Sequence, residues 1–361
     1  MTQSRIPAWT WLAPIAGWAL LAISLAARHP LLAALQGAAM IGCVLSAVHH
    51  AEVVAHHVGE PLGTLLLALA VTAIEVALIA SLMLTEGEAA ATLARDTVFA
   101  SIMIILNGMI GLCLLVAALR HGEQSFGLYG VNATLAALAA ITIITLVLPN
   151  TTTSVGGASY STSQLSFVAV VALLVYGVFV LVQTVRHRDY FLPLAAPEQD
   201  EEERPDPPPS RTSAAVSGML MLISLGAVIL LAKSLSPVVE RAVDSVQAPK
   251  AAVGVIIAAL VLLPESLAAL AAARANKIQT SLNLALGSAM ASIGLTIPVV
   301  AAISIATGHP LVLGLGHKGT TFLLLSLIVA TLSLGTGRTI ALQGVVHLII
   351  FGVYLFTTIV P

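Results

Sequence analysis

Two glutamates near the middle of long apolar runs are the residues of this sequence with the clearest chemical potential. Glu75 lies in residues 59–80 (GEPLGTLLLALAVTAIEVALIA) and Glu265 in residues 254–273 (GVIIAALVLLPESLAALAAA). An ionisable side chain at membrane depth is energetically costly and is usually kept for function. One such residue could be a protonated carboxyl hydrogen-bonded within a helix bundle, but two at matching positions favour a shared site. We therefore predict that Glu75 and Glu265 bind cations and protons.

Oxygen atoms next to the two glutamates suit a hard cation. Thr72 precedes Glu75 by three residues and so falls on the same helical face. Pro264 directly precedes Glu265 and leaves a backbone carbonyl free one turn earlier, an irregularity that is tolerated at membrane depth where it lines a cavity. Carboxylate, hydroxyl and carbonyl oxygens favour Ca²⁺ or Na⁺ over Zn²⁺ or Cu²⁺.

The apolar run after each glutamate adds neutral polar side chains. In the second half Ser288 and Ser292 share a stripe with Ser281 and Thr296, whereas the first half has fewer such groups, among them Ser101 and Asn107. Any single serine could simply bond to a neighbouring helix. A stripe next to an acidic helix is better explained as the lining of an ion pathway.

A group of histidines precedes the first acidic run. His49, Glu52 and His56 fall on one face if this segment is helical. A zinc site would need three or four convergent ligands with organised hydrogen bonds around them. We favour an interfacial helix whose imidazoles lie in water, with a regulatory role as proton sensor as the further possibility, since histidine titrates near neutral pH.

The composition is that of an integral membrane protein surrounded by lipid. Of 361 residues, 58% are hydrophobic and 9% are charged, against about 25% charged residues in a soluble domain. No basic stretch is present that would bind nucleic acid. Eleven apolar runs of spanning length predict an all-α fold with about eleven transmembrane helices. They lie at about residues 8–27, 31–48, 61–84, 97–119, 128–149, 165–185, 214–235, 251–273, 281–306, 311–333 and 339–360.

A charged, proline-rich stretch at residues 186–213 divides the chain. It contains APEQDEEERPDPPPSRTS, a composition that cannot pack a core and that favours an extended form. We interpret it as a cytoplasmic linker, with a cation-sensing regulatory segment as the alternative. The remaining parts are then an extra N-terminal helix at residues 1–30, retained rather than cleaved, and five-helix repeats at residues 31–185 and 214–361.

The two repeats are predicted to have opposite orientations in the membrane. Glu265 follows Glu75 by 190 positions, and at this shift the helices before and after each glutamate overlay. Because each repeat has an odd number of spans, five, the second repeat enters the membrane from the opposite side. Inverted repeats of this kind recur in secondary transporters, with sites near the bilayer midplane. Over alternate loops, nine Lys and Arg residues share the side of the N-terminus and six lie opposite. This bias predicts a cytoplasmic N-terminus.

Four segments carry a resemblance to a known family: GEPLGTLLLALAVTAIEVALI, RDTVFASIMIILNGMIGL, LVLLPESLAALAAARANKIQTSLNLALGSAMASIGLTIPVV and GTGRTIALQGVVHLIIFGVYL. They resemble the bacterial calcium/proton antiporters of the cation/calcium exchanger superfamily, from about residue 31 onward. The resemblance implies two inverted five-helix repeats in a bacterial inner membrane, with Glu75 and Glu265 binding the ion and protons. It further implies roles for four other residues: Asn107, Ser288 and Ser292 as pathway lining, and Glu52 in an amphipathic stretch before the first acidic helix.

One departure from that family concerns the transported ion. Many members have Gly-Asn ahead of the acid, whereas this chain has Val71-Thr72 in the first half and Leu262-Leu263-Pro264 in the second. An amide ligand is thereby missing from each acidic helix. Relatives of the family that share this variant pattern ahead of the acid look able to exchange Na⁺ or K⁺ as well as Ca²⁺.

The sequence therefore predicts a secondary active cation/proton antiporter, Ca²⁺/H⁺ in the first instance, which is not an enzyme and has no cofactor. Cation and protons would compete for the two glutamates, and the proton gradient would drive export. The alternatives are a Na⁺(K⁺)/H⁺ antiporter of the same fold, a membrane-embedded hydrolase with an acid pair, and a cation channel. Against a hydrolase, the sequence contains no GxGD or HExxH motif. Against a channel, repeated acids on two inverted halves imply alternating access, which a channel does not use. The sequence does not predict the oligomeric state.

Overall fold

The structure, a computed structural model, describes residues 7–26, 30–58, 62–192, 209–245, 249 and 251–360. Each of the eleven predicted apolar runs coincides with a helix or a run of helices in these ranges, so the predicted all-α fold is confirmed. In the described part of the chain, eight helical segments are long and apolar enough to cross a membrane, or nine if one bent pair counts as a single span. The count of eleven spans is not confirmed.

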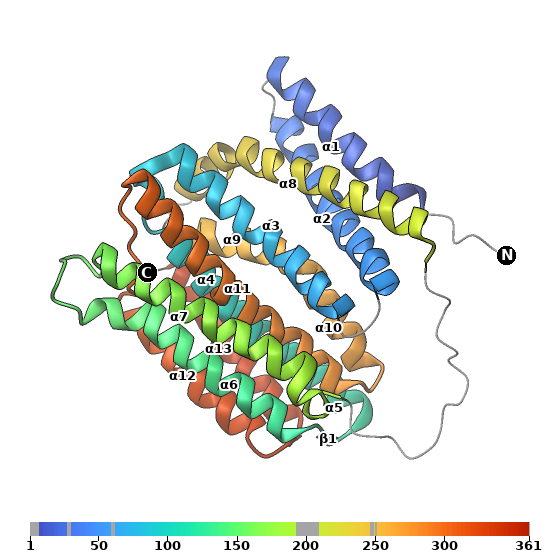
Figure 1. The fold of residues 1–361 in the computed structure, drawn as a ribbon, viewed down its shortest axis with the longest axis vertical. Coiled ribbons are helices and arrows are strands. Elements are labelled where there is room, and N and C mark those ends of the chain that lie inside the picture. The colour runs from blue at the N-terminus through green and yellow to red at the C-terminus, as the bar shows by residue number, and fades with distance from the viewer. Residues whose placement is uncertain are drawn as a thin grey trace. The chain divides into compact units, whose positions relative to one another are not determined.

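The helices of the chain pack into two compact units. The first comprises residues 1–81 and 196–246. Its helices are α1 (Ala8–Ala26), α2 (Pro30–Val58), α8 (Arg211–Ser245) and the greater part of α3 (Leu62–Glu86), which ends in the second unit. The helices α1, α2 and α8 pack side by side (Figure 1). The helix outside the predicted repeats, α1, is thus packed against the first helix of each repeat.

Hydrogen bonds between polar side chains join the helices of the first unit. Ser46 of α2 lies 3.1 Å from Ser224 of α8, measured between the hydroxyl oxygens, and its hydroxyl donates to the carbonyl of Thr10 on α1. Gln36 donates from Nε2 to the hydroxyl of Ser234 over 3.2 Å. Such bonds, together with close packing, hold helices together in lipid, where apolar side chains gain little by leaving the hydrocarbon.

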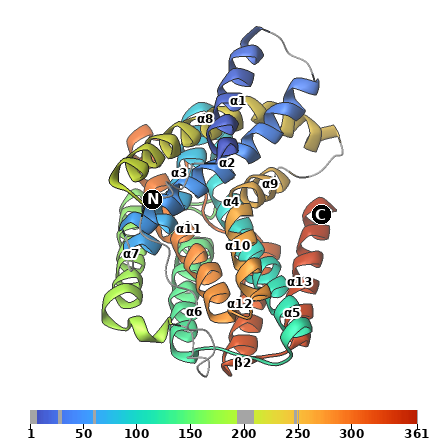
Figure 2. The same cartoon turned by 90° about the vertical axis from the view of Figure 1, so that its right-hand side faces the viewer.

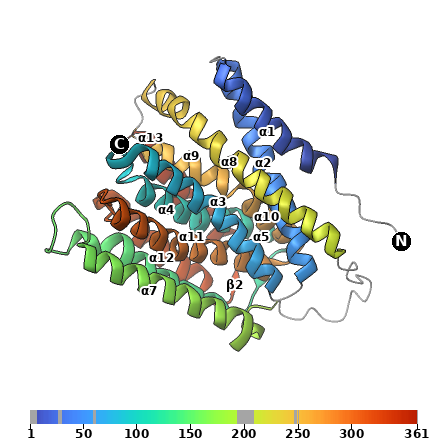
Figure 3. The same cartoon turned by 45° about the horizontal axis from the view of Figure 1, so that its top comes forward.

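The second unit comprises residues 82–195 and 247–361. Its helices are η1 (Gly87–Ala90), α4 (Leu93–Met103), η2 (Ile104–Met109), α5 (Ile110–His121), α6 (Leu128–Thr142), η3 (Ile143–Val147), η4 (Leu148–Asn150), α7 (Thr162–Leu181), η5 (Val182–Arg186), η6 (Arg188–Tyr190), α9 (Ala251–Val261), α10 (Leu263–Arg274), α11 (Ile278–Thr307), α12 (His317–Leu334) and α13 (Ala341–Ile359). The core lies around α11, which packs against α4, α6, α7 and α10 (Figure 3). Consistent with this central place, α11 is buried on most of its faces.

Two glycines let α5 and α13 approach closely, as Figure 2 shows for these two neighbouring helices. A Cβ atom on Gly344 would lie 2.6 Å from the backbone nitrogen of Leu115 and 2.8 Å from the carbonyl oxygen of Gly111. A Cβ atom on Gly111 would lie 2.9 Å from the Cβ of His347. Small residues at helix interfaces are the usual means of close approach in membranes. Here they bring α13 and its histidine against α5.

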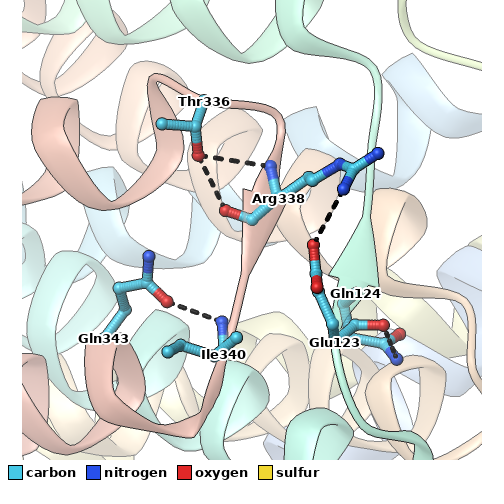
Figure 4. Close-up of polar contacts among 6 residues, drawn as sticks. All are labelled: Glu123, Gln124, Thr336, Arg338, Ile340 and Gln343. Atoms are coloured by element: carbon cyan, nitrogen blue, oxygen red, sulfur yellow. Dashed lines mark hydrogen bonds and ion pairs between the residues drawn. The ribbon is translucent and has the colours of Figure 1, made fainter.

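A short antiparallel pair of strands, β1 (Gln124–Ser125) and β2 (Arg338–Thr339), joins two loops of the second unit. Beside it, Arg338 and Glu123 form an ion pair of 3.3 Å in which both side chains are mainly exposed (Figure 4). An exposed pair contributes about 0–1 kcal/mol. The side chain of Gln343 accepts a hydrogen bond of 2.6 Å from the backbone N–H of Ile340 and so caps the start of α13 (Figure 4).

The helix predicted from residue 311 begins later than expected. Residues 308–316 are not helical, and α12 starts at His317. Backbone N–H groups of this stretch bond to carbonyls elsewhere: Val312 to Ala91, Gly314 to Ala158 and Leu315 to Leu146. These bonds replace the intrahelical ones, and the apolar composition that predicted a helix here reflects burial instead.

Candidate functional site

Glu75 lies inside an uninterrupted helix. The side chain of Glu75 is 2% exposed and that of Thr72, one turn earlier on α3, is 5% exposed. No proline or glycine lies between Thr72 and the end of α3 at Glu86. The structure therefore places the carboxylate and the hydroxyl together on the buried face of this helix.

Glu265 follows a helix break. Helix α9 ends at Val261 and α10 begins at Leu263, with the two axes bent by 56°. Pro264, which is buried, has no N–H, so the carbonyl of Leu260 cannot receive the usual bond from it. Glu265 consequently lies in the first turn of α10, where the helix dipole favours a negative charge. The two glutamates thus occupy unlike backbone settings, a continuous helix and a helix start.

The predicted meeting of the two carboxylates stays a prediction. Glu75 belongs to the first unit and Glu265 to the second. Within its own unit, Glu265 is half-buried on α10, which packs against α11 and α5. A small residue also lets α9 approach α4, since a Cβ on Gly254 would lie 3.1 Å from the carbonyl carbon of Asp96 on α4.

Buried hydroxyls lie along α11 and α4, two helices of the second unit that pack together. On α11, Ser292 is 1% exposed and Thr296 is fully buried, while Ser288 is half-buried. On α4, Thr97 and Ser101 are fully buried. The hydroxyls of Thr97 and Thr296 have no hydrogen-bond partner among the described residues. Thr97 was not predicted, although its spacing of four residues from Ser101 places the two on the same face of a helix.

Asn107 lies in η2, a π-helical segment between α4 and α5. Such segments are rare and often found at functional positions. The Asn107 side chain is fully buried, donates from Nδ2 to the hydroxyl of Ser326 over 2.8 Å, and has Oδ1 3.3 Å from Nδ1 of His347. The amide is thus directed toward α12 and α13. Ser326 and His347 were not predicted, because their partner lies more than two hundred residues away in sequence.

The histidine segment is part of α2 rather than a separate interfacial helix. Helix α2 continues to Val58, beyond the predicted end at residue 48. Glu52 and His56 are exposed, whereas the half-buried His49 contacts Trp9 with ring centroids 5.7 Å apart. Within the described ranges, no group of three His, Cys, Asp or Glu side chains could hold a metal ion. The structure therefore does not bring His49, Glu52 and His56 together as a zinc site.

The predicted linker falls largely outside the described residues, which leave out 193–208. Both of its described ends contact helices. The carbonyl of Phe191 accepts a bond of 2.5 Å from Nδ2 of Asn283 on α11, and that of Pro209 lies 2.6 Å from Nδ1 of His57 on α2. The linker is thus tied to one helix at each of these ends.

The chain is similar in sequence to a known protein family and to two transport proteins over most of its length. The family model described as sodium/calcium exchanger protein matches residues 29–185 and 216–360. The y4hA protein of Sinorhizobium fredii (strain NBRC 101917 / NGR234) is 46% identical over 99% of this chain and 98% of its own length. The sodium-potassium/proton antiporter ChaA of Escherichia coli (strain K12) is 39% identical over 91% of this chain and 89% of its own.

A solved structure shares the fold at low sequence identity. The native structure of YfkE has a TM-score of 0.74 and 18% identity, and the match covers 98% of this chain and 100% of that one. In a second crystal structure, in which selenium has been substituted, YfkE is named as a Ca²⁺/H⁺ antiporter.

Proposed function

The chain belongs to the sodium/calcium exchanger protein family, and on that premise we propose that it is a secondary active antiporter exchanging a cation, Ca²⁺ in the first instance, for protons across a bacterial inner membrane. One observation carries the proposal: each predicted repeat has one glutamate near the middle of a long apolar run, Glu75 in α3 and Glu265 in the first turn of α10. Two carboxylates supply negative charge for a cation and sites for protons.

The surrounding oxygens support a hard cation. Thr72 lies one turn from Glu75 on the same buried face. In the other unit, Ser288 and Ser292 offer hydroxyls on α11, and Pro264 frees a carbonyl before Glu265. Oxygen ligands of this kind suit Ca²⁺ and Na⁺. We propose that these groups line the pathway in which both glutamates meet.

Competition for the carboxylates couples the two fluxes. A carboxylate must be ionised to bind a cation, so cation and protons exclude one another. Alternating access then follows if the site reorients when it holds either the cation or protons, as in transporters built from inverted repeats. In this mechanism the proton gradient drives the cation outward, and the N-terminus and the linker are on the cytoplasmic side.

A Na⁺(K⁺)/H⁺ antiporter is the second candidate, and two observations favour it. The acidic helices have Val71-Thr72 and Leu262-Leu263-Pro264 where many family members have Gly-Asn, so each lacks an amide ligand. In addition, the relative ChaA is named for sodium, potassium and protons. The difference between the candidates lies in the transported ion rather than in the mechanism.

Proton-driven accumulation in proteoliposomes tests the proposal. The purified chain is reconstituted with a proton gradient imposed, and uptake of Ca²⁺, Na⁺ and K⁺ is measured separately with the membrane potential clamped. An antiporter accumulates its cation above the outside concentration, and accumulation is lost when an ionophore dissipates the proton gradient. A channel would only equilibrate the cation. Uptake that never exceeds equilibrium for any of the three cations would refute the proposed function.

A further inference from the structure

Three cationic side chains lie where helices α5 and α10 end. Nε2 of His121, the last residue of α5, is 3.1 Å from the carbonyl oxygen of Arg274, the last residue of α10, so the two C-termini meet. Arg120 precedes His121 in sequence, and Lys277 follows Arg274 by three residues. The side chains of Arg120, Arg274 and Lys277 are all exposed. Two packed helices thus present three positive charges at their common end.

A tight turn between α10 and α11 fixes the position of Lys277. Asn276 has a φ of 60°, in the left-handed region that asparagine adopts more readily than most residues. The backbone N–H of Lys277 donates to the carbonyl of Ala272 over 2.9 Å. The backbone of Lys277 is therefore bound to the last turn of α10, next to Arg274, before α11 begins at Ile278.

Acidic side chains do not neutralise these three charges. In the described part of the chain, the ion pairs join Arg95 to Asp96 and Arg338 to Glu123. Glu123, the acid that follows α5, is thus engaged with Arg338 (Figure 4).

The helix dipole accounts for only two of the three cations. A positive charge is favoured at a helix C-terminus, as for Arg120 on α5 and Arg274 on α10, and disfavoured at an N-terminus. Lys277 is the N-cap residue of α11. Its position next to Arg274 therefore calls for another explanation, and a negatively charged ligand shared by both side chains is one.

This end of the second unit has the features of a boundary between hydrocarbon and lipid headgroups. On α5, Leu112 is 40% and Leu119 is 72% exposed, so an apolar stripe leads directly to Arg120. The loop after α5 leads to Tyr129, which is 73% exposed and contacts the exposed Tyr190 with ring centroids 5.4 Å apart. Tyrosine is enriched at membrane–water interfaces. The cations consequently lie at the level of phosphate groups.

We propose that Arg120, Arg274 and Lys277 bind the headgroup of an anionic phospholipid. Guanidinium groups bind phosphate oxygens through parallel hydrogen bonds, and an ammonium group adds a point charge. Basic pockets between transmembrane helices are known to bind anionic headgroups. The acyl chains would lie along the apolar stripe of α5, and the headgroup would anchor the last turn of α10, whose first turn carries Glu265. This binding does not depend on the proposed exchange.

Lipid binding to the purified full-length chain tests the site without a transport assay. Native mass spectrometry in detergent measures the affinity for phosphatidylglycerol and, separately, for zwitterionic phosphatidylcholine. We expect phosphatidylglycerol to bind more tightly, and Arg274→Gln/Lys277→Gln to weaken its binding about fivefold for each cation removed. An equal affinity of the native chain for both lipids would overturn the inference.

The matched control removes two cations from another part of the same unit. Arg186 and Arg188 are exposed beyond the end of α7, and Figure 2 shows α7 on one side of α11 and α5 on the other. Arg186→Gln/Arg188→Gln should therefore bind phosphatidylglycerol as the native chain does. Equal affinities of the two double variants would show that only the total charge matters, and the site would be refuted.

Thermal unfolding distinguishes a lipid site from a purely structural role of the cations. Phosphatidylglycerol should raise the unfolding midpoint of the native chain more than phosphatidylcholine does. This difference should shrink in Arg120→Gln and be kept in Arg120→Lys. If Arg120→Gln lowers the midpoint equally in both lipids and keeps the difference, the cation only stabilises the end of α5 and the inference fails.

Two other occupants are decided by the same measurements. Inorganic phosphate, at the concentration of the lipid phosphate, should not reproduce the stabilisation, and if it does, the cations hold free phosphate rather than a lipid. A chain with residues 198–208 replaced by a neutral segment should bind phosphatidylglycerol as the native chain does. Tighter binding by that chain would show that the acidic residues of the linker occupy the cations, which would also overturn the inference.

Discussion

Asn107 and Ser326 form a hydrogen bond of 2.8 Å between side chains that are both fully buried. Asn107 belongs to the first predicted repeat and Ser326 to the second. The bond thus joins the third helix of one repeat to the fourth helix of the other within the second unit. Because Asn107 also faces His347, this amide is the centre of a polar cluster in an otherwise apolar interior.

Replacing Ser326 with alanine should destabilise the fold modestly. The substitution removes the hydroxyl that accepts from Nδ2 of Asn107, and bonds between helices in membrane proteins contribute about 0.6 kcal/mol on average and about 1.7 kcal/mol at most. Thermal unfolding in detergent should show a lower midpoint. Thr331→Ala on the same helix is the control, since the exposed Thr331 bonds only to the carbonyl of Leu327 in its own helix. Equal midpoints for the two variants would show that the cluster adds no stability.

Gly344→Ala should be more damaging. Its Cβ would meet backbone atoms of Leu115 and Gly111 at 2.6 and 2.8 Å, and backbone cannot move aside as a flexible side chain can. We expect a loss of about 1–3 kcal/mol through overpacking. The matched control is Gly352→Ala, on the same helix with nothing within 4 Å of the added atom. Thermal unfolding should separate the two, and a Gly344→Ala protein as stable as the control would contradict the observed contact of α5 with α13.

The sequence predicted the helices well because the requirement for apolar residues in lipid is local. It also predicted an irregular backbone before Glu265, since Pro264 removes a backbone donor wherever it occurs in a helix. The division of the predicted run at residues 251–273 into two helices bent by 56° was not predicted. Helix ends were less well predicted. Helix α2 continues through a polar segment to Val58, and residues 311–316 are not helical because their backbone groups bond to other segments.

The sequence indicated Glu75, Glu265 and Asn107 as candidate site residues, but not the residues that Asn107 contacts. The glutamates are conspicuous in an apolar run, whereas the cluster of Asn107, Ser326 and His347 joins positions 219 and 240 residues apart. Such pairing follows from tertiary packing and from the π-helical turn at η2, which adds a residue to the helical turn. Neither is visible in local periodicity.

The two glutamates should each be essential for transport. Glu75→Gln and Glu265→Gln keep the shape of the side chain but remove its charge, and we expect exchange to be abolished while the protein still inserts. Proteoliposome flux is the measurement. Glu123→Gln is the control, because Glu123 is exposed and forms only a surface ion pair with Arg338. Near-normal flux in either buried variant would refute the assignment of that residue.

The linker should be dispensable for transport itself. We would replace residues 198–208 with a neutral flexible segment of equal length and keep Pro209, whose carbonyl contacts His57. The composition of this segment cannot form a core, so maximal exchange should be preserved, even if apparent cation affinity shifts. Loss of maximal exchange in a folded, monodisperse protein would show that the segment does more than connect the repeats.

The apparent KM for the cation should fall as the pH rises, and then reach a plateau. A carboxylate binds the cation only when ionised, so protons compete at low pH and cease to compete once both glutamates are deprotonated. Two acids in one site would titrate as a coupled pair. Tyr160 does not contribute, because burial raises the pKa of its phenol to about 12. Initial rates in proteoliposomes at several cation concentrations give KM at each pH. In Glu75→Asp, if active, the titration range should move while the direction is kept. A KM independent of pH, with active exchange throughout, would mean that protons are carried by groups other than Glu75 and Glu265, and the histidine segment at residues 49–57 would then be the first place to test.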